Sequence, residues 1–444
     1  MNILLTEKCT NYCPYCFAQA RMINSPANGF ISLEAFKELL DFLCKSKVGH
    51  INLIGGEPLI HPNIVEIINM VNKADTIKTV SIFSGGIIAL EKVRQLSHCL
   101  IPEKYSIVFN LNNKDDYSNR HHSQLMTNIE YLKSLGCDLT IGYNIYKESF
   151  NYKEIFEICD YLDIYKIRWS IAYPGIEKDT QFIHPTRYNA IRNRVYQFII
   201  DAHERNFELT LDCQLPLCFF TEEQIPKILF LYPQFLERFG KCSPAIDIGV
   251  DLKVWRCFVL HDDIKGNLKD FNNVKEIYRF FKTKTDNFSL YTEPPEYCAD
   301  CEYWERKLCQ GGCLSFNMDL INKGRQKRNE YENLLDTYRK GNLMSGKTRL
   351  LRCLSDCVED TDFLLRVLYF VVEKDDYDII VAFYNRHKLR VHRLRNPVIL
   401  YLISIGFVNN KDKKSALSVI SEGLKITQNS KLKQKFRELI RLAK

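Results

Sequence analysis

The first 212 residues alternate between strand-like and helix-like hydrophobic patterns. Short runs rich in Ile, Val and Leu, bounded by Gly, Asn or Lys, predict strands, and helical periodicity recurs between them. The predicted strands are 2–6, 50–54, 79–83, 106–111, 139–145, 166–172 and 207–211. Because such alternation is typical of right-handed βαβ units, we expect an α/β fold with a parallel sheet. The number of units favours a partial barrel, although the pattern is also compatible with an open doubly wound sheet.

The clearest helix prediction covers residues 32–44, where apolar side chains recur at helical spacing. Ser32 would cap this helix, and Glu34 suits its positive end. Pro62 is expected in the first turn of the following helix. The apolar face of that second helix would consist of Ile64, Ile67, Ile68 and Val71.

Two further regions follow the predicted barrel. Residues 213–328 lose helical periodicity and are dense in cysteine, which indicates a small cysteine-rich domain. Residues 329–444 look all-helical, and 396–406, 414–425 and 430–443 resemble paired helices of a tetratricopeptide-like array. Such an array would offer a concave surface to peptides or partners, and the alternative is a helical cap on the preceding domain. The predicted domains are therefore 1–212, 213–328 and 329–444.

Composition places the chain among ordinary globular proteins. Its 444 residues suit two or three domains, and 46% hydrophobic with 26% charged residues excludes a disordered chain or a coiled-coil rod. The net charge of +7 is mild, so we expect no nucleic-acid partner, and we expect the basic run 323–328 at a solvated helix start. With no apolar run of about 18 residues and no signal-peptide pattern, we expect a cytoplasmic protein that binds no membrane.

Cysteine is the informative residue type, with 17 in the chain. In a reducing compartment this number favours metal ligation or catalysis over disulfides. Cys9, Cys13 and Cys16 directly follow the first predicted strand. Three thiolates on one loop can bind three irons of a 4Fe–4S cluster and leave the fourth iron open to a substrate or cofactor. Zinc would need a fourth nearby ligand, and no His or Cys follows at zinc-finger spacing.

Gly55, Gly56 and Glu57 form a second motif, directly after the second predicted strand. Paired glycines allow a backbone to approach a ligand closely, and the carboxylate can hold an ammonium group. Alone this motif would equally suit a plain turn. In combination with the three-cysteine loop it resembles the radical S-adenosylmethionine (SAM) superfamily, over about residues 1–212. The resemblance implies a partial (β/α)6 barrel for this region.

The same resemblance implies a mechanism. The open iron would chelate SAM, an electron from the cluster would cleave its sulfonium, and the resulting 5′-deoxyadenosyl radical would abstract a substrate hydrogen. The implied SAM-binding positions are Gly55, Gly56, Glu57, Ser84, Asn110 and Arg120. Among them Glu57 would bind the SAM ammonium, and Arg120 lies near the place of the family's carboxylate-binding Arg. We expect the adjacent His121 and His122 to be loop residues rather than metal ligands.

A third constellation comprises six cysteines beyond the predicted barrel: Cys242, Cys257, Cys298, Cys301, Cys309 and Cys313. Six thiols exceed one tetrahedral site, so two zinc ions or one to two iron–sulfur clusters are the options. Their spacing resembles the SPASM domain, an extension that holds auxiliary 4Fe–4S clusters in enzymes acting on peptides and proteins. The resemblance implies a first cluster held by Cys242, Cys257 and Cys313. A second cluster would be held by Cys298, Cys301 and Cys309.

The pattern departs from that family in three respects, one of which is a longer gap between Cys301 and Cys309. The early cysteine that often precedes Cys242 is missing, and no cysteine follows Cys313 before Cys353. Cys213 or Cys218 could replace the first, and Cys353 or Cys357 could supply a ligand, or one iron could stay open. Separately, Cys218 could face the substrate and donate a hydrogen atom, as a catalytic residue. The remaining cysteines, which we expect in core packing, are Cys44, Cys99, Cys137 and Cys159.

The resemblance implies an enzyme that modifies a peptide or protein by a crosslink, thioether or cyclophane bond. The substrate could carry a leader peptide, and the reductant would be a partner such as flavodoxin or ferredoxin. Peptide epimerisation, sulfatase maturation and small-molecule dehydrogenation are the enzymatic alternatives. Against sulfatase maturation, Phe258 stands after Cys257, where those enzymes usually carry Asp. A non-catalytic iron–sulfur adaptor is the alternative from another class.

Overall fold

The computed structural model describes residues 1–19, 22, 29–175, 180–243, 245–261, 263–339 and 346–443. The chain forms two compact units. The first unit contains residues 1–286 and 294–318, and the second contains 287–293 and 319–444. The predicted barrel and most of the predicted cysteine-rich region therefore belong to one unit, while the division into three domains stays a prediction.

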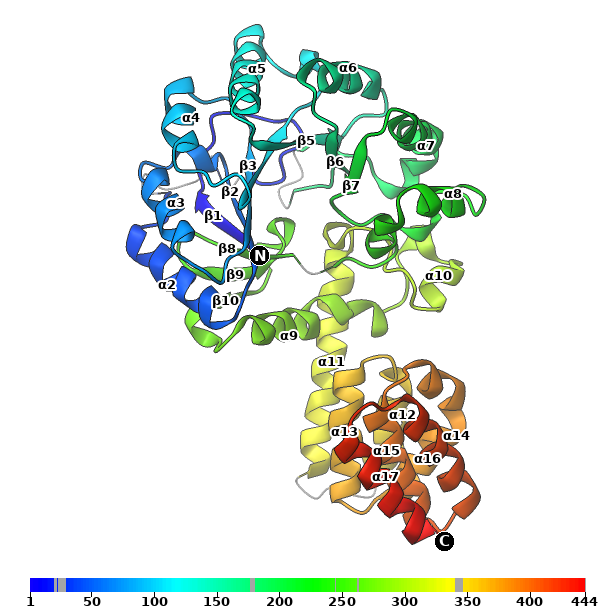
Figure 1. Ribbon diagram of the computed structural model, residues 1–444. Coiled ribbons are helices and arrows are strands. Elements are labelled where there is room, and N and C mark those ends of the chain that lie inside the picture. The colour runs from blue at the N-terminus through cyan, green and yellow to red at the C-terminus, as the bar shows by residue number, and fades with distance from the viewer. Residues whose placement is uncertain are drawn as a thin grey trace. The chain divides into compact units, whose positions relative to one another are not determined.

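A ten-stranded sheet organises the first unit, in the order β10-β9-β8-β1-β2-β3-β4-β5-β6-β7 (Figure 1). Its parallel part consists of β1 Asn2–Thr6, β2 His50–Gly55, β3 Thr79–Ser84, β4 Tyr105–Asn110, β5 Asp138–Ile145, β6 Lys166–Ile171 and β7 Glu208–Leu211. Each of these strands pairs in parallel with the next one along the chain. The predicted strands and the parallel sheet are confirmed. The sheet is open, because β7 and β10 are its edges.

Three short strands extend the sheet on the other side of β1, and the sequence pattern did not predict them. They are β8 Ile246–Ile248, β9 Lys253–Arg256 and β10 Lys265–Asn267. β8 lies parallel to β1, and β9 and β10 continue antiparallel. Asn2 Nδ2 donates to Asp247 Oδ1 at 2.6 Å across this junction. Strands of three or four residues carry too few positions for a period of two to be recognised.

Helices alternate with the parallel strands: α2 Leu33–Lys45, α3 Ile64–Asn72, α4 Leu90–Ser97, α5 Asn119–Ser134, α6 Tyr152–Leu162 and α7 Tyr188–Glu204. Ser32 caps α2 as predicted, since its Oγ accepts from Ala35 N at 3.1 Å. The prediction for Pro62 is wrong, because α3 begins at Ile64 with Asn63 as its N-cap. The predicted apolar face of α3 is buried. The unit also contains α8 Gln224–Leu231, α9 Val274–Lys284 and α10 Glu302–Glu305.

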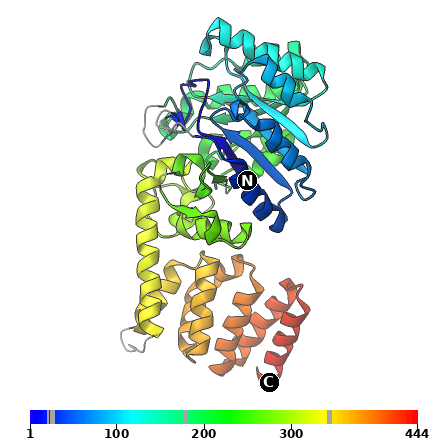
Figure 2. The same ribbon diagram turned by 90° about the vertical axis from the view of Figure 1, so that its left-hand side faces the viewer.

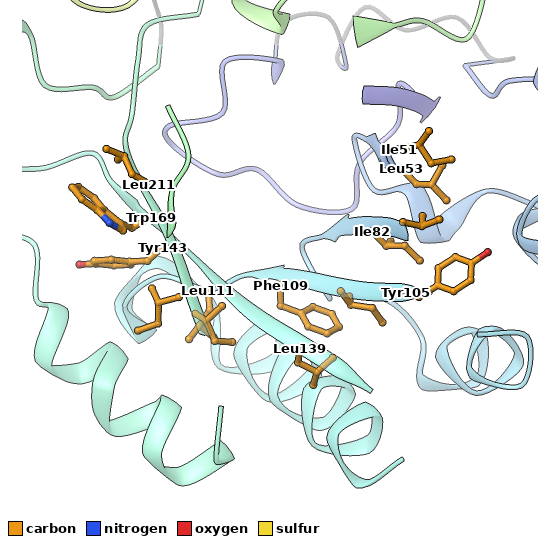
Figure 3. Packing of buried hydrophobic residues seen from close by; sticks show 14 of the residues in the cluster. Ile51, Leu53, Ile82, Tyr105, Phe109, Leu111, Leu139, Tyr143, Trp169 and Leu211 are labelled. Atoms are coloured by element: carbon orange, nitrogen blue, oxygen red, sulfur yellow. The ribbon is translucent and has the colours of Figure 1, made fainter. Parts of the chain in front are cut away.

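One apolar cluster lies between this sheet and its helices. Figure 3 shows side chains from successive strands in it, including Ile51 of β2, Ile82 of β3, Phe109 of β4 and Trp169 of β6. Cys159 belongs to this cluster, and the predicted packing role of Cys44, Cys99 and Cys137 agrees with their positions against it. Burial of these side chains fixes the strands, and with them the loops that leave their carboxyl ends.

The second unit is helical (Figure 2). Its helices are α11 Met318–Arg339, α12 Gly346–Asp356, α13 Thr361–Glu373, α14 Tyr377–Arg393, α15 Pro397–Asn409, α16 Lys413–Ile426 and α17 Ser430–Ala443. They enclose a core of their own. The predicted helices 396–406, 414–425 and 430–443 are confirmed, whereas their assignment to a tetratricopeptide-like array stays a prediction.

One expectation for this unit is wrong. The basic run 323–328 lies inside α11 rather than at a helix start, and Arg328 is buried. Its guanidinium lies 3.7 Å from the buried carboxylate of Asp360, which also accepts from Tyr291 Oη at 2.7 Å. A buried carboxylate requires such partners, which explains why one residue of a basic run turns inward. No helix in the described part of the chain has both the length and the apolar character needed to cross a membrane.

Candidate functional site

The loop after β1 carries the three predicted cluster ligands. Asn11 N donates to Cys9 Sγ at 3.4 Å, and Asn11 Nδ2 donates to Cys13 Sγ at 3.3 Å. The Cys16 amide closes a turn onto the Cys13 carbonyl at 3.0 Å. All three thiols are partly buried. A cavity of about 250 Å³ adjoins the loop and is lined by Lys8, Cys9, Asn11, Tyr12, Cys16, Gln19 and Met22.

Electrostatics show that these thiols lie close together. Burial raises the pKa of Cys9 to about 11 and that of Cys13 to about 12. The charges of neighbouring groups, Cys16 among them, contribute to both of these pKa values. Thiolates in this place therefore need a compensating cation, and metal binding supplies one. No three His, Cys, Asp or Glu side chains of the described residues converge on a single metal ion. A cubane cluster fits this loop because each thiolate would bind a different iron.

The Gly55–Glu57 segment packs directly on the beginning of this loop. Gly56 N donates to Thr6 O at 2.9 Å, and Glu57 N donates to Lys8 O at 2.8 Å. A Cβ atom on Gly56 would overlap the Lys8 carbonyl and lie 2.9 Å from the Cys9 nitrogen. The glycines are thus required by the close approach of the chain's own backbone. Through these contacts the structure brings the two predicted motifs together.

The Glu57 carboxylate accepts several hydrogen bonds within the protein. Ser84 Oγ lies 2.9 Å from both carboxylate oxygens, Gly85 N donates at 2.8 Å and Leu59 N at 3.1 Å. Only 1% of Glu57 is exposed. Burial raises its pKa to about 7, and the hydrogen bonds oppose this rise. Glu57 and Ser84, both predicted SAM-binding positions, therefore join the carboxyl ends of β2 and β3.

We expect the Glu57→Gln variant to lose a pH dependence that the parent protein has. The folded protein holds the Glu57 proton to a higher pH than the unfolded chain does, since the pKa rises from 4.5 to about 7. This contribution to the free energy of unfolding is complete below the unfolded pKa and is lost as the pH rises through about 7. Denaturant titrations should therefore show that, as the pH rises from the unfolded pKa to the folded pKa, the free energy of unfolding of the parent falls by about 3 kcal/mol relative to that of E57Q. If the free energies of unfolding of the two proteins changed with pH in the same way, the raised pKa of Glu57 would be contradicted.

A polar network at the carboxyl ends of β4 to β6 was missed by sequence reasoning. Tyr15 Oη of the cysteine loop donates to Asn112 Oδ1 at 3.3 Å. Asn112 Nδ2 donates to the Asn144 carbonyl at 2.9 Å, and Ser170 Oγ donates to Asn144 Oδ1 at 2.9 Å. The sequence did carry a signal for this network, because polar residues stand at the ends of these apolar strands or directly after them. The network couples the cysteine loop to three further strands.

Charged residues continue this network. The rings of Tyr15 and Tyr146 lie 5.1 Å apart, and the Tyr146 hydroxyl donates to Asp116. Lys147 Nζ forms an ion pair with Asp116 Oδ1 at 2.9 Å. The site therefore offers a fixed carboxylate, a cation and a phenol beside the three-cysteine loop.

Two predicted SAM-binding positions lie apart from the Glu57 contacts. Asn110 ends β4, and its carbonyl accepts from Tyr117 Oη at 3.2 Å. Arg120 is exposed in the first turn of α5 and makes no hydrogen bond or ion pair with described residues of the cysteine loop. The expectation that His121 and His122 lie in a loop is wrong, because both belong to α5. The helix begins before these two residues, where Ser118 Oγ caps it by accepting from His121 N at 3.2 Å.

Electrostatic interactions link cysteines within each of the two groups that the resemblance implies. In the first, Arg256 Nη2 donates to Cys242 Sγ at 3.4 Å, and Cys313 and Cys257 are close enough for their charges to interact. Burial raises the pKa of Cys257 well above its ordinary range. In the second group, burial raises the pKa of Cys298 to about 12, and the next contributions come from Cys301 and Cys309, in that order. Their roles as ligands stay predictions.

Comparison with known proteins identifies the N-terminal part of the chain. Residues 3–162 match the family model described as the Radical SAM superfamily. This match confirms the predicted radical SAM resemblance over that range.

Curated relatives match shorter stretches. Molybdenum cofactor biosynthesis protein 1 from Homo sapiens is 27% identical over 119 residues, which are 24% of this chain and 19% of that protein. GTP 3',8-cyclase from Aquifex aeolicus is 28% identical over 116 residues, which are 23% of this chain and 36% of that protein. The chain thus spans only a minor part of the length of either relative.

Solved structures share the fold over more of the chain. Streptococcus suis SuiB bound to S-adenosylmethionine has a TM-score of 0.51 and 14% identity, covering 72% of this chain and 73% of SuiB. Native anSMEcpe with bound AdoMet has a TM-score of 0.51 and 15% identity, covering 73% of this chain and 96% of anSMEcpe. At these identities the likeness concerns the fold.

Proposed function

We propose that the protein is a radical SAM enzyme with auxiliary iron–sulfur clusters that modifies a peptide or protein. The observation that carries the proposal is the three-thiol loop, folded against the Gly55–Glu57 segment at the carboxyl ends of parallel strands. Cys9, Cys13 and Cys16 would hold the SAM-binding 4Fe–4S cluster. When bound, this cluster would supply the electron for reductive cleavage of SAM.

The chain's own residues would orient SAM and exclude water. The buried Glu57 carboxylate fixes the β2 and β3 loop ends, which places the Gly55–Glu57 backbone beside the cysteine loop. Tyr15 anchors the same loop to Asn112, which follows β4. Two anchored ends reduce the freedom of the loop before any ligand binds, which lowers the entropic cost of assembling the site.

Auxiliary clusters are supported by the two cysteine groups of the first unit. Cys242, Cys257 and Cys313 would hold one cluster, and Cys298, Cys301 and Cys309 would hold another. Arg256, which is 1% exposed, donates to Cys242 Sγ and pairs with Asp286 at 2.8 Å. A buried guanidinium beside thiolates would offset the negative charge that a cluster brings.

The peptide substrate is supported by the extent of the fold likeness. A structure described as Streptococcus suis SuiB bound to precursor peptide SuiA matches 72% of this chain, at a TM-score of 0.51 and 15% identity. That stretch exceeds the length of residues 3–162, to which the superfamily match is confined. We expect the protein to work in the cytoplasm with a reductant such as flavodoxin or ferredoxin.

A second candidate is a small-molecule enzyme, because the sequence relatives include GTP 3',8-cyclases. The two candidates differ in their substrate, so deuterium transfer discriminates them. Anaerobically reconstituted protein, SAM and dithionite would be incubated with GTP or with the peptide encoded beside the gene, each bearing deuterium at carbon. Deuterated 5′-deoxyadenosine from the peptide alone is expected. Deuterium only from GTP would replace the proposal by the second candidate, and absence of any SAM cleavage would favour an adaptor.

We expect the second unit to contribute to binding of an acidic leader peptide. Lys388, Arg393 and Arg395 are exposed basic residues in or just after α14. The nearby Arg390 pairs with Glu359 at 2.9 Å, so it is left out of this basic set. Changing the three exposed residues to Glu should weaken leader-peptide binding in fluorescence anisotropy, and the difference should shrink as salt rises.

A matched control keeps the net charge change equal. Lys425, Lys431 and Arg437 are exposed on α16 and α17, and their triple Glu variant should bind the peptide as the parent does. Equal weakening in both variants would show that only overall charge matters. Unchanged binding in the α14 variant would contradict a role for this surface.

A further inference from the structure

Gly240 connects three cysteine-bearing segments of the first unit. Its amide donates to the Leu215 carbonyl at 2.8 Å, and its carbonyl accepts from Gln310 N at 3.1 Å. A Cβ atom on Gly240 would overlap the Leu308 carbonyl and lie 3.3 Å from the Leu217 side chain. The residue has a φ of +83°, so the backbone conformation also favours glycine. The loop after β7, the segment before Cys242 and the segment around Cys309 are therefore packed together through one residue.

Cys213 begins the loop after β7, two residues before Leu215. Burial raises the pKa of Cys213 well above its ordinary range, and the charges of Cys257, Cys313 and Cys242 raise it further. These three are the cysteines of the first predicted cluster. The Gly240 contact to Leu215 thus brings the Cys213 segment to the segment before Cys242, although the two cysteines are 29 positions apart in the sequence.

Cys218 ends the same loop and adjoins Leu217, which packs on Gly240. Its pKa is raised by burial and then by the charges of Cys309 and Cys301. Cys298 in turn interacts with Cys218. Arg192 Nη2 donates to the Cys218 carbonyl at 3.1 Å and fixes this end of the loop to α7. Gly240 contacts both Leu217 and Leu308, so the segment of Cys218, whose side chain is exposed, lies beside the segment of Cys309.

Two buried glutamines point independently to ligands in this region. Gln214 follows Cys213 and is 2% exposed, and Gln310 follows Cys309 and is 4% exposed. Neither amide nitrogen has a hydrogen-bond partner among the described residues, and the Gln214 oxygen has none either. Buried amide donors normally have partners, because an unpaired one costs about 1–3 kcal/mol. The sulfides and thiolates of bound clusters would accept from such donors.

We propose that the loop 213–218 completes both auxiliary sites, with Cys213 as the fourth ligand beside Cys242, Cys257 and Cys313. Cys218 is then the fourth ligand beside Cys298, Cys301 and Cys309. The assignment rests on the auxiliary clusters of the proposed function. It adds the fourth ligand of each cluster, which the cysteine spacing left open. Neither auxiliary cluster then keeps an open iron, and Cys218 is a structural ligand instead of a hydrogen donor. Cys353 and Cys357 pack in the core of the second unit and ligate neither cluster.

Iron counting in the full chain tests this assignment without any enzymatic readout. The background is the Cys9, Cys13, Cys16→Ala variant, which removes the SAM-binding cluster and should retain about eight irons after anaerobic reconstitution. Adding Cys213→Ala or Cys218→Ala should remove between about one and four of these irons and change the EPR spectrum of the reduced protein. Cys213→Ser and Cys218→Ser, checked for folding by circular dichroism, replace the Ala variants if those misfold.

Two matched controls complete the design. Cys353→Ala and Cys357→Ala test the alternative ligands and should leave iron and the EPR spectrum unchanged. Cys159→Ala removes a buried packing cysteine from the first unit and should also leave iron unchanged. Full iron in the Cys213 and Cys218 variants, or iron loss with Cys353→Ala, would overturn the assignment while the proposed function stands. Iron near zero in the background would overturn the auxiliary clusters altogether, and SAM cleavage by the parent remains a separate measurement.

Discussion

Replacing Cys9, Cys13 and Cys16 together by Ala is expected to reduce 5′-deoxyadenosine formation to the level of an assay without enzyme. The physical reason is that the described lining of the adjoining cavity offers no substitute ligand. Among the described residues of the cavity that adjoins this loop, Cys9 and Cys16 are the only cysteines, and no His, Asp or Glu lines it. Chromatography of the products after anaerobic incubation with SAM and dithionite measures the effect.

The control for this experiment is a triple variant of packing cysteines. Cys44, Cys99 and Cys137 lie against the apolar core, outside the loop, and their replacement by Ala removes the same number of thiols. This control should keep SAM cleavage within a few-fold of the parent. Cleavage that persists in the loop variant would refute the assignment of the SAM-binding cluster to this loop.

The Gly56→Ala variant is expected to produce the second largest effect. The new methyl group would overlap the Lys8 carbonyl and press on the Cys9 nitrogen, and a backbone cannot move aside as a flexible side chain does. We expect a loss of about 3 kcal/mol in the free energy of unfolding, because overpacking at rigid sites costs this much. The cysteine loop should shift with Lys8, so SAM cleavage should fall together with about four irons.

Gly49 provides the matched control. It lies directly before β2, at the other end of the strand from Gly56, and a Cβ atom there would meet no atom within 4 Å. Gly49→Ala should therefore change the free energy of unfolding by less than about 0.5 kcal/mol. Iron analysis, SAM cleavage and denaturant titration of both variants check the prediction. A Gly56→Ala protein with full iron and parental stability would show that the two motifs are not in contact.

Much of the site was predictable because its ligands are contiguous in the sequence. Cys9, Cys13 and Cys16 lie within eight positions, and the thiol chemistry of such a loop does not depend on the rest of the fold. The paired glycines of the second motif were also recognised. Their approach to a ligand stays a prediction, and in the structure they accommodate the backbone of Thr6 to Cys9. Only the register between β1 and β2 creates that close approach.

Residues that meet across strands could not be assigned from the sequence. The contact of Glu57 with Ser84 depends on the parallel pairing of β2 and β3, and Asn112 reaches Tyr15 only after the sheet has formed. Likewise, Cys213 and Cys218 are separated from their partners by 29 to 100 positions, and the contacts of Gly240 bring their segments together. Spacing motifs carry no information on such distant pairs.

The sequence by itself determined the strands β1 to β7, the helical tail and the three-thiol loop, because periodicity and local chemistry act over a few residues. Tertiary structure alone decided that β8 to β10 join the same sheet and that Arg328 turns inward to Asp360. It also decided which thiols lie near one another beyond the barrel. The reason is that burial and charge compensation depend on which segments are in contact. Those contacts are determined by the packing of the whole chain.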